Sequence, residues 1–151
     1  MAMRENTVTY FPDLFVLSSY SLSGTRVSVV KVGYLDGVHP FPKGSLEPRL
    51  VDKIKLLAAK APALAFGTHV CEICVAPPGV VPKYVFIEGD LKMIDPDCAW
   101  WKWRKQRQGN GEIRVAGDGA PFEAPVLIVH YIEEHGYLPP LEFLQAIDKA
   151  R

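Results

Sequence analysis

Two pairs of potential metal ligands most constrain how this chain can fold. Cys71 and Cys74 form a C-x₂-C pair, and His130 and His135 form an H-x₄-H pair after a gap of 55 residues. Thiolates and imidazoles are the ligands that Zn²⁺ prefers in tetrahedral sites, and the spacing within each pair fits such a site. A compact zinc finger has about a dozen to fifteen residues between its pairs. A folded domain must therefore bring these two halves together.

Helical geometry does not decide whether His135 or His69 is the fourth ligand. At about 100° per residue, His130 and His135 lie about 140° apart around a helix axis. His135 can therefore join the site only if the last turn of the helix is loosened. Gly136 at the predicted helix end permits such loosening. His69 would share a side with Cys71 in an extended segment. The first set is Cys71, Cys74, His130 and His135, and the alternative replaces His135 with His69.

Other interpretations of the cysteines have weaker support. The two cysteines could be small buried hydrophobes and His130 a core histidine. A thioredoxin-like redox pair would open a helix, but Val75-Ala76-Pro77-Pro78 follows here. We predict a structural Zn²⁺ site, because four protein ligands fill a tetrahedral shell. The enzymatic alternative is a metal-dependent hydrolase with Glu72 or Glu133 as general base, although no H-E-x-x-H motif is present.

A second feature is the segment from Trp100 to Arg107, which holds all three tryptophans beside four cations. Aromatic faces and cations together suit single-stranded nucleic acid or a protein contact. The candidate binding residues are Trp100, Trp101, Trp103, Arg104, Lys105 and Arg107.

The preferred interpretation of this segment is a hairpin strand. Gly109-Asn110-Gly111 would form the turn that joins it to a strand at residues 112–115. A three-residue turn would place Trp101 and Trp103 on the same face as Ile113 and Val115, and so in the core. A two-residue turn would reverse the faces and expose both tryptophans.

Hydrophobic periodicity predicts a single α+β domain over residues 1–151. The 25 prolines and glycines among 151 residues favour short elements. Strands are expected at residues 8–11, 26–35, 84–87 and 112–115, and helices at 46–60, 124–135 and 139–149. Residues 126–132 would also make a buried strand. The expected architecture is a small antiparallel sheet with about three helices, held together by the metal site.

The charges balance overall, with 17 basic and 17 acidic side chains. This balance excludes attraction of the whole surface to nucleic acid or an anionic membrane. Locally the charges separate: residues 86–97 carry four acids against one lysine, and residues 100–107 carry four cations. An electrostatic partner would bind there.

The sequence indicates a cytoplasmic protein. It has no run of eighteen apolar residues to span a membrane and no signal-peptide pattern at its start. Three cysteines, two of them close together, do not resemble a secreted disulfide framework.

Two longer motifs contain the metal-ligand pairs. Residues 67–74 read G-x-H-x-C-x-x-C, and residues 130–140 read H-Y-x-x-x-H-x-Y-x-P-P. With most of residues 30–147, they resemble a family of small bacterial proteins of unknown function. The resemblance implies that His69, Cys71, Cys74, His130 and His135 belong together. The family has a shorter segment in place of residues 77–108, which therefore looks like an insertion.

The sequence thus favours a non-enzymatic cytoplasmic protein with a structural zinc site. It would act through contacts with a protein partner. The sequence names neither that partner nor the oligomeric state.

Overall fold

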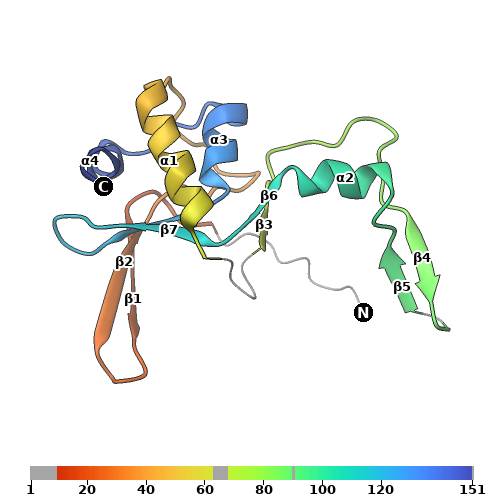
Figure 1. Cartoon of the computed structure of the whole chain (residues 1–151), viewed down its shortest axis with the longest axis horizontal. Coiled ribbons are helices and arrows are strands. Elements are labelled where there is room, and N and C mark those ends of the chain that lie inside the picture. The colour runs from red at the N-terminus through yellow and green to blue at the C-terminus, as the bar shows by residue number, and fades with distance from the viewer. Residues whose placement is uncertain (1–9, 63–67, 90, 151) are drawn as a thin grey trace.

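The largest sheet in the described part of the chain has four strands (Figure 1). The computed structural model describes residues 10–62, 68–89 and 91–150. The sheet has the order β1-β2-β8-β7; its strands are β1 (Phe15–Tyr20), β2 (Arg26–Lys31), β8 (Phe122–Pro125) and β7 (Glu112–Val115). The pairs β1·β2 and β7·β8 are antiparallel, whereas β2·β8 is parallel. The sheet is therefore mostly antiparallel.

Three helices gather on one side of the sheet (Figure 1). They are α1 (Pro48–Lys60), α3 (Ile128–His135) and α4 (Leu141–Lys149), and α1 contacts both α3 and α4. Their apolar faces meet in one core, whose fully buried members include Ile54, Ile128, Tyr131, Phe143 and Ile147. The chain is an α+β domain, as the sequence predicts.

The helix predicted at residues 46–60 is present and begins two residues later, at Pro48. Leu50 and Ile54 are buried on α1, and Leu46 and Leu57 pack against the core. Pro48 stands in the first turn, where its missing N–H has no helical partner to lose. Glu47 precedes the helix, and no side chain caps its first turn.

The predicted helix over residues 124–135 is correct only in its second part. Residues 122–125 form β8, and the ladder continues where the Val126 N–H donates to the Gly111 carbonyl at 3.0 Å. Strand pairing prevails here because all four residues of β8 are buried. The last helix likewise starts two residues later than predicted, after Pro139 and Pro140.

The segment of residues 77–108 forms a lobe beside the main body (Figure 1). It contains the antiparallel hairpin of β4 (Tyr84–Ile87) and β5 (Leu91–Ile94), followed by α2 (Ala99–Lys105). The lobe joins the body through β3 (Thr68–Val70) and β6 (Gln108–Asn110), which pair antiparallel. We call this two-stranded connection the neck.

The predicted hairpin between residues 100–107 and 112–115 is wrong. Residues 99–105 are helical, β6 pairs with β3, and β7 pairs with β8. Cys98 caps α2, because its Sγ accepts a hydrogen bond from the Trp101 N–H at 3.4 Å. Gly111 does not close a hairpin. It takes a φ of 107°, and a Cβ there would lie 2.6 Å from the Pro62 carbonyl oxygen.

The prediction that Trp101 and Trp103 lie in the core with Ile113 is also wrong. No residue of α2 is buried, and both tryptophans are half-buried in the lobe. The error follows from the helix, which places them in contact with cations of their own segment instead of with β7.

Strand β1 is absent from the sequence prediction, which has a strand at residues 8–11. Residues 8 and 9 lie outside the described residues, and Tyr10 and Phe11 are in no strand. All six residues of β1 are exposed, so the alternation that marks a half-buried strand is missing. None of the helices in the described part of the chain is long and apolar enough to cross a membrane.

Candidate metal centre

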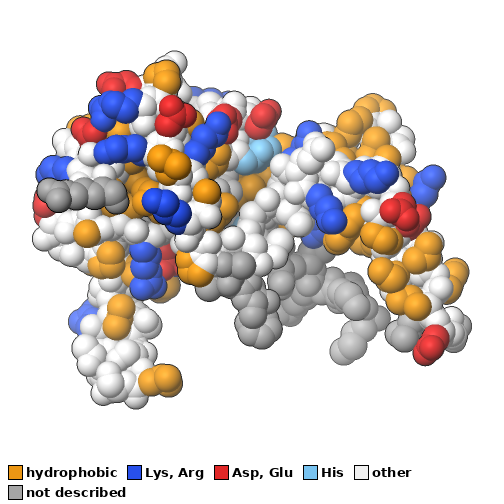
Figure 2. Space-filling model, in the orientation of Figure 1, with side chains coloured by type: hydrophobic (Ala, Val, Ile, Leu, Met, Phe, Trp, Pro, Cys, Tyr) orange, Lys and Arg blue, Asp and Glu red, His pale blue; other side chains and the backbone are white. Residues whose placement is uncertain are grey.

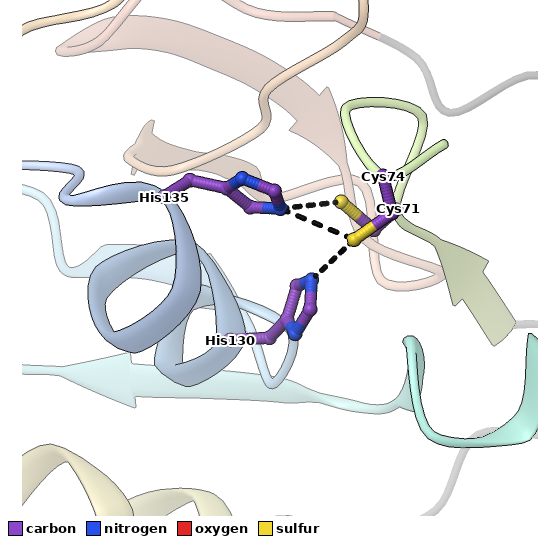
Figure 3. Close-up of side chains that lie close together, drawn as sticks. All are labelled: Cys71, Cys74, His130 and His135. Atoms are coloured by element: carbon purple, nitrogen blue, oxygen red, sulfur yellow. Dashed lines mark hydrogen bonds between the residues drawn. The ribbon is translucent and has the colours of Figure 1, made fainter. Parts of the chain in front are cut away.

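Four side chains from two distant parts of the chain converge beside the neck (Figure 3). Their ligand atoms, the sulfurs of Cys71 and Cys74 and one imidazole nitrogen each of His130 and His135, all lie within 4.8 Å of one another. The cysteines come from the turn after β3, and the histidines come from α3. The fold therefore brings together the two pairs that 55 residues separate in sequence.

The turn that holds the cysteines begins as an extension of the neck. The Cys71 N–H donates to the Arg107 carbonyl at 2.8 Å, which continues the ladder of β3 and β6. The N–H groups of Ile73 and Cys74 then donate to the Cys71 sulfur. These two bonds wind the chain tightly enough to place both sulfurs on one side.

The histidines stand near the two ends of α3. His135 is its last residue, and Gly136 follows in the left-handed conformation with a φ of 66°. The N–H groups of Gly136 and Tyr137 both donate to the Tyr131 carbonyl, which closes the helix. The helix stays regular through His135, so no loosening of its last turn is needed. The rings reach from neighbouring sides and their centroids lie 5.0 Å apart.

The distances fit one tetrahedral ion. The Nε2 of His130 lies 3.2 Å from the Cys74 sulfur, and the Nε2 of His135 lies 3.4 Å and 3.3 Å from the sulfurs of Cys71 and Cys74. Ordinary Zn–S and Zn–N bonds at the tetrahedral angle separate sulfur from nitrogen by about 3.5 Å. The four residues could therefore hold a metal ion without a rearrangement of the backbone.

The electrostatics of the site also suit a cation. Burial raises the pKa of the Cys71 thiol to about 11, and the neighbouring Cys74 adds to this effect. Burial lowers the pKa of His130 and of His135, and His135 lowers that of His130 further. The imidazoles are thus neutral and able to bind a metal, while a nearby divalent charge would stabilise the thiolates.

His69 lies outside this group of four described residues. Its ring packs edge-on against Tyr34, with centroids 6.1 Å apart. Burial and the nearby Lys31 lower its pKa. Of the two candidates for the fourth ligand, the structure brings His135 and not His69 to the cysteines.

The carboxylates proposed as general bases are engaged elsewhere. Glu72 accepts a hydrogen bond from the Gly37 N–H at 3.3 Å. Glu133 pairs with Lys55 at 3.0 Å on the exposed side of α3. Neither residue belongs to the group of ligand atoms.

Three of the four cations of the Trp100–Arg107 segment lie over its own tryptophans. Each cation stands four residues after the ring that it covers; the pairs are Arg104 over Trp100 at 5.1 Å, Lys105 over Trp101 at 6.0 Å, and Arg107 over Trp103 at 4.7 Å. These contacts link the aromatic and basic side chains to one another. They stabilise α2 and leave less of each ring for a base to stack on.

The sequence prediction missed a second polar group, on the sheet face away from the helices. Lys31 and Glu123 are buried and form an ion pair, and Arg114 donates to the second oxygen of Glu123 at 3.0 Å and 2.9 Å. Tyr34 donates to Glu123 at 3.3 Å, and Glu112 also hydrogen-bonds Glu123. The available signal was Lys31, a charged residue among valines in β2.

Comparison with known proteins identifies a family whose function is unknown. No curated protein and no solved structure matches the chain. A family model described as a domain of unknown function (DUF7919) matches residues 9–148. This range contains both metal-ligand pairs and the whole 77–108 segment. The chain belongs to this family of domains of unknown function.

Proposed function

We propose that Cys71, Cys74, His130 and His135 bind one Zn²⁺ ion in a structural site. The convergence of the four ligand atoms within 4.8 Å carries this proposal. Zn²⁺ suits the two thiolates and two imidazoles, because it is borderline soft and accepts tetrahedral geometry readily. Four protein ligands leave no position for a water molecule, which supports a structural role.

The hydrolase alternative has less support. It needs a general base beside the ion, and the carboxylates of Glu72 and Glu133 interact with Gly37 and Lys55 instead. The nucleic-acid alternative is also weaker, because three of the four cations of the Trp100–Arg107 segment lie over its own tryptophans. We therefore propose a non-enzymatic cytoplasmic protein that acts through protein contacts.

The 77–108 segment is the surface that we propose for those contacts. The β4–β5 hairpin exposes large apolar side chains; they are Tyr84, Val85, Phe86, Ile87 and Met93, between 38% and 69% exposed. Contiguous exposed apolar side chains commonly mark protein interaction sites. Figure 2 shows apolar and basic side chains together on this lobe.

Metal analysis of the purified full chain tests the site. Wild type is expected to contain about one equivalent of zinc, and Cys71→Ser, Cys74→Ser and His135→Ala are each expected to lose most of it. Cys98→Ser is the matched control, because Cys98 is buried but caps α2 instead of joining the group. His69→Ala should keep the metal. Retention in His135→Ala together with loss in His69→Ala would assign the fourth ligand to His69.

Coordination and partner binding test the rest of the proposal. X-ray absorption at the zinc edge should show two sulfur and two nitrogen neighbours, whereas an oxygen neighbour would support the hydrolase alternative. Crosslinking in cells should identify a protein that binds wild type and not Phe86→Lys. If both chains capture the same proteins, the β4–β5 hairpin is not the contact surface.

A further inference from the structure

The outer strand β1 is an unprotected sheet edge. It pairs with β2 on one side and is the end of the strand order, so its other side has no strand partner among the described residues. The β1–β2 hairpin projects from the main body, with apolar side chains on its surface (Figures 1 and 2). Its backbone is therefore accessible to another strand.

Natural proteins block such edges with lysine, proline, bulges or covering elements. Residues 14–25 contain no charged side chain and no proline. The pairing of β1 with β2 runs without interruption over six residues, from Phe15 opposite Lys31 to Tyr20 opposite Arg26, so no bulge bends the edge. The hydroxyls of Ser18 and Ser28 join the two strands further at 2.8 Å.

The charged residue that precedes this stretch is turned away from the edge. Asp13 accepts hydrogen bonds from the Gly33 N–H at 3.0 Å and from the buried Tyr137 hydroxyl at 2.8 Å. The chain then turns at Leu14, which has a φ of 69°, and the Phe15 N–H donates to the Pro12 carbonyl. A left-handed leucine is strained, so this turn is held by the surrounding contacts and sends β1 outward.

The exposed side chains of β1 continue an apolar stripe. Phe15 and Leu17 share a face with Val27 and Val29 of β2, and Val29 is buried while the other three are 38% to 42% exposed. On the opposite face Val16 is 56% exposed. Among the described residues, the edge thus offers unpaired backbone and uncovered apolar surface together.

We propose that β1 pairs antiparallel with β1 of a second copy of this chain. An edge-to-edge contact through a two-fold axis pairs each strand with its identical copy, so the lengths match. The neutral stretch places no like charges opposite each other, which is the usual obstacle to self-pairing. A two-fold axis perpendicular to the sheet would join the two apolar stripes and produce one eight-stranded sheet. This inference does not depend on the metal site or on the 77–108 segment.

Sedimentation of the full metal-loaded chain from about 5 to about 500 µM tests the proposal, because dimers form by mass action. Wild type should change from monomer to dimer, and Val16→Lys and Leu17→Lys should each weaken dimerisation at least about tenfold by placing cations at the two-fold axis. The controls are Leu22→Lys in the β1–β2 turn and Val38→Lys in a loop, because both side chains are exposed and neither belongs to the apolar stripe or the edge. Both controls should still dimerise.

Three results would overturn the proposal. They are a wild-type monomer at every concentration, dimerisation that Val16→Lys and Leu17→Lys leave unchanged, or a dimer lost only in Phe86→Lys, which would move the interface to the β4–β5 hairpin. Hydrogen exchange of wild type tests the edge without a variant. Amides of β1 should exchange more slowly at the higher concentration, and equal rates would also overturn the proposal.

Discussion

The Sγ atom of Cys74 lies 3.2 Å from the Nε2 atom of His130, although the two residues are 56 positions apart. This contact joins the turn after the neck to the helix that covers the sheet. The site therefore links the 77–108 lobe to α3. An ion bound there would stabilise both.

Removal of the metal should loosen the neck before the core. The neck has only three residues in each strand, and its last bond, from Cys71 to Arg107, adjoins the ligands. After chelation, amides of β3 and β6 should exchange with solvent much faster, while Ile54 and Ile147 in the core remain protected.

Hydrogen exchange before and after chelation measures this effect. Cys71→Ser should reproduce the behaviour of the chelated protein without a chelator. Equal protection of the neck in the two metal states would contradict a role for the metal in holding the lobe.

Replacement of Glu123 by glutamine should destabilise the fold by about 3 to 5 kcal/mol, because Lys31 would stay buried after losing the anionic partner of its ion pair. Chemical unfolding measures the loss, with exposed Glu142→Gln as the control. A change below about 0.5 kcal/mol, which is typical of surface substitutions, would mean that the ion pair contributes little.

The same residue predicts a pH dependence. Burial acts to raise the pKa of Glu123, but hydrogen bonds from Lys31 and Arg114 outweigh it and lower the pKa. A lowered folded pKa contributes stability above the unfolded pKa of about 4.3 and loses it as the pH falls below that value. Wild type should therefore lose more stability on acidification than Glu123→Gln, and parallel curves would contradict the prediction.

Glu112 should have the opposite dependence. Burial and the charge of Glu123 raise its pKa, so the folded state favours its protonated form. This contribution is full below the unfolded pKa and is lost as the pH rises through the raised folded value. Glu112→Gln supplies a permanent hydrogen-bond donor. We expect it to be more stable than wild type near neutral pH by up to about 1 kcal/mol, and a less stable variant would contradict this explanation.

Gly136→Ala should cost about 1 kcal/mol and weaken metal binding. The position requires a φ of 66°, and a Cβ there would meet no atom within 4 Å, so the penalty comes from the backbone alone. Gly119→Ala is the control, because Gly119 has open space and no positive φ. Thermal unfolding and zinc titration measure the two effects. Equal behaviour of the variants would show that the end of α3 tolerates a side chain.

The four candidate ligands and the most regular helix could be predicted from the sequence for local reasons. The C-x₂-C and H-x₄-H spacings follow from ligand chemistry, and Leu50 and Ile54 follow from helical periodicity. The choice between His69 and His135 needed the fold. In the fold, the ring of His69 packs against Tyr34, whereas His135 at the end of α3 reaches the cysteines.

The errors arose where two structures were locally plausible. Gly109-Asn110-Gly111 is a good hairpin turn, but Gly109 lies against the backbone of Leu127 and Gly111 against Pro62, so tertiary packing determines their conformations. Ala124 and Pro125 suit a helix start, but pairing with β7 places them in a strand. No local pattern reports such long-range pairing.

The neck allows the segment between its two strands to vary in length during evolution. The chain leaves the body after Cys74 and returns at Arg107, whose carbonyl already bonds to Cys71 across the neck. The two ends of the intervening segment are therefore held close together by the body itself. Residues can be added or removed between them without moving the core or the ligands. The 77–108 lobe can thus differ in size and surface from one relative to another while the fold that carries the lobe stays the same.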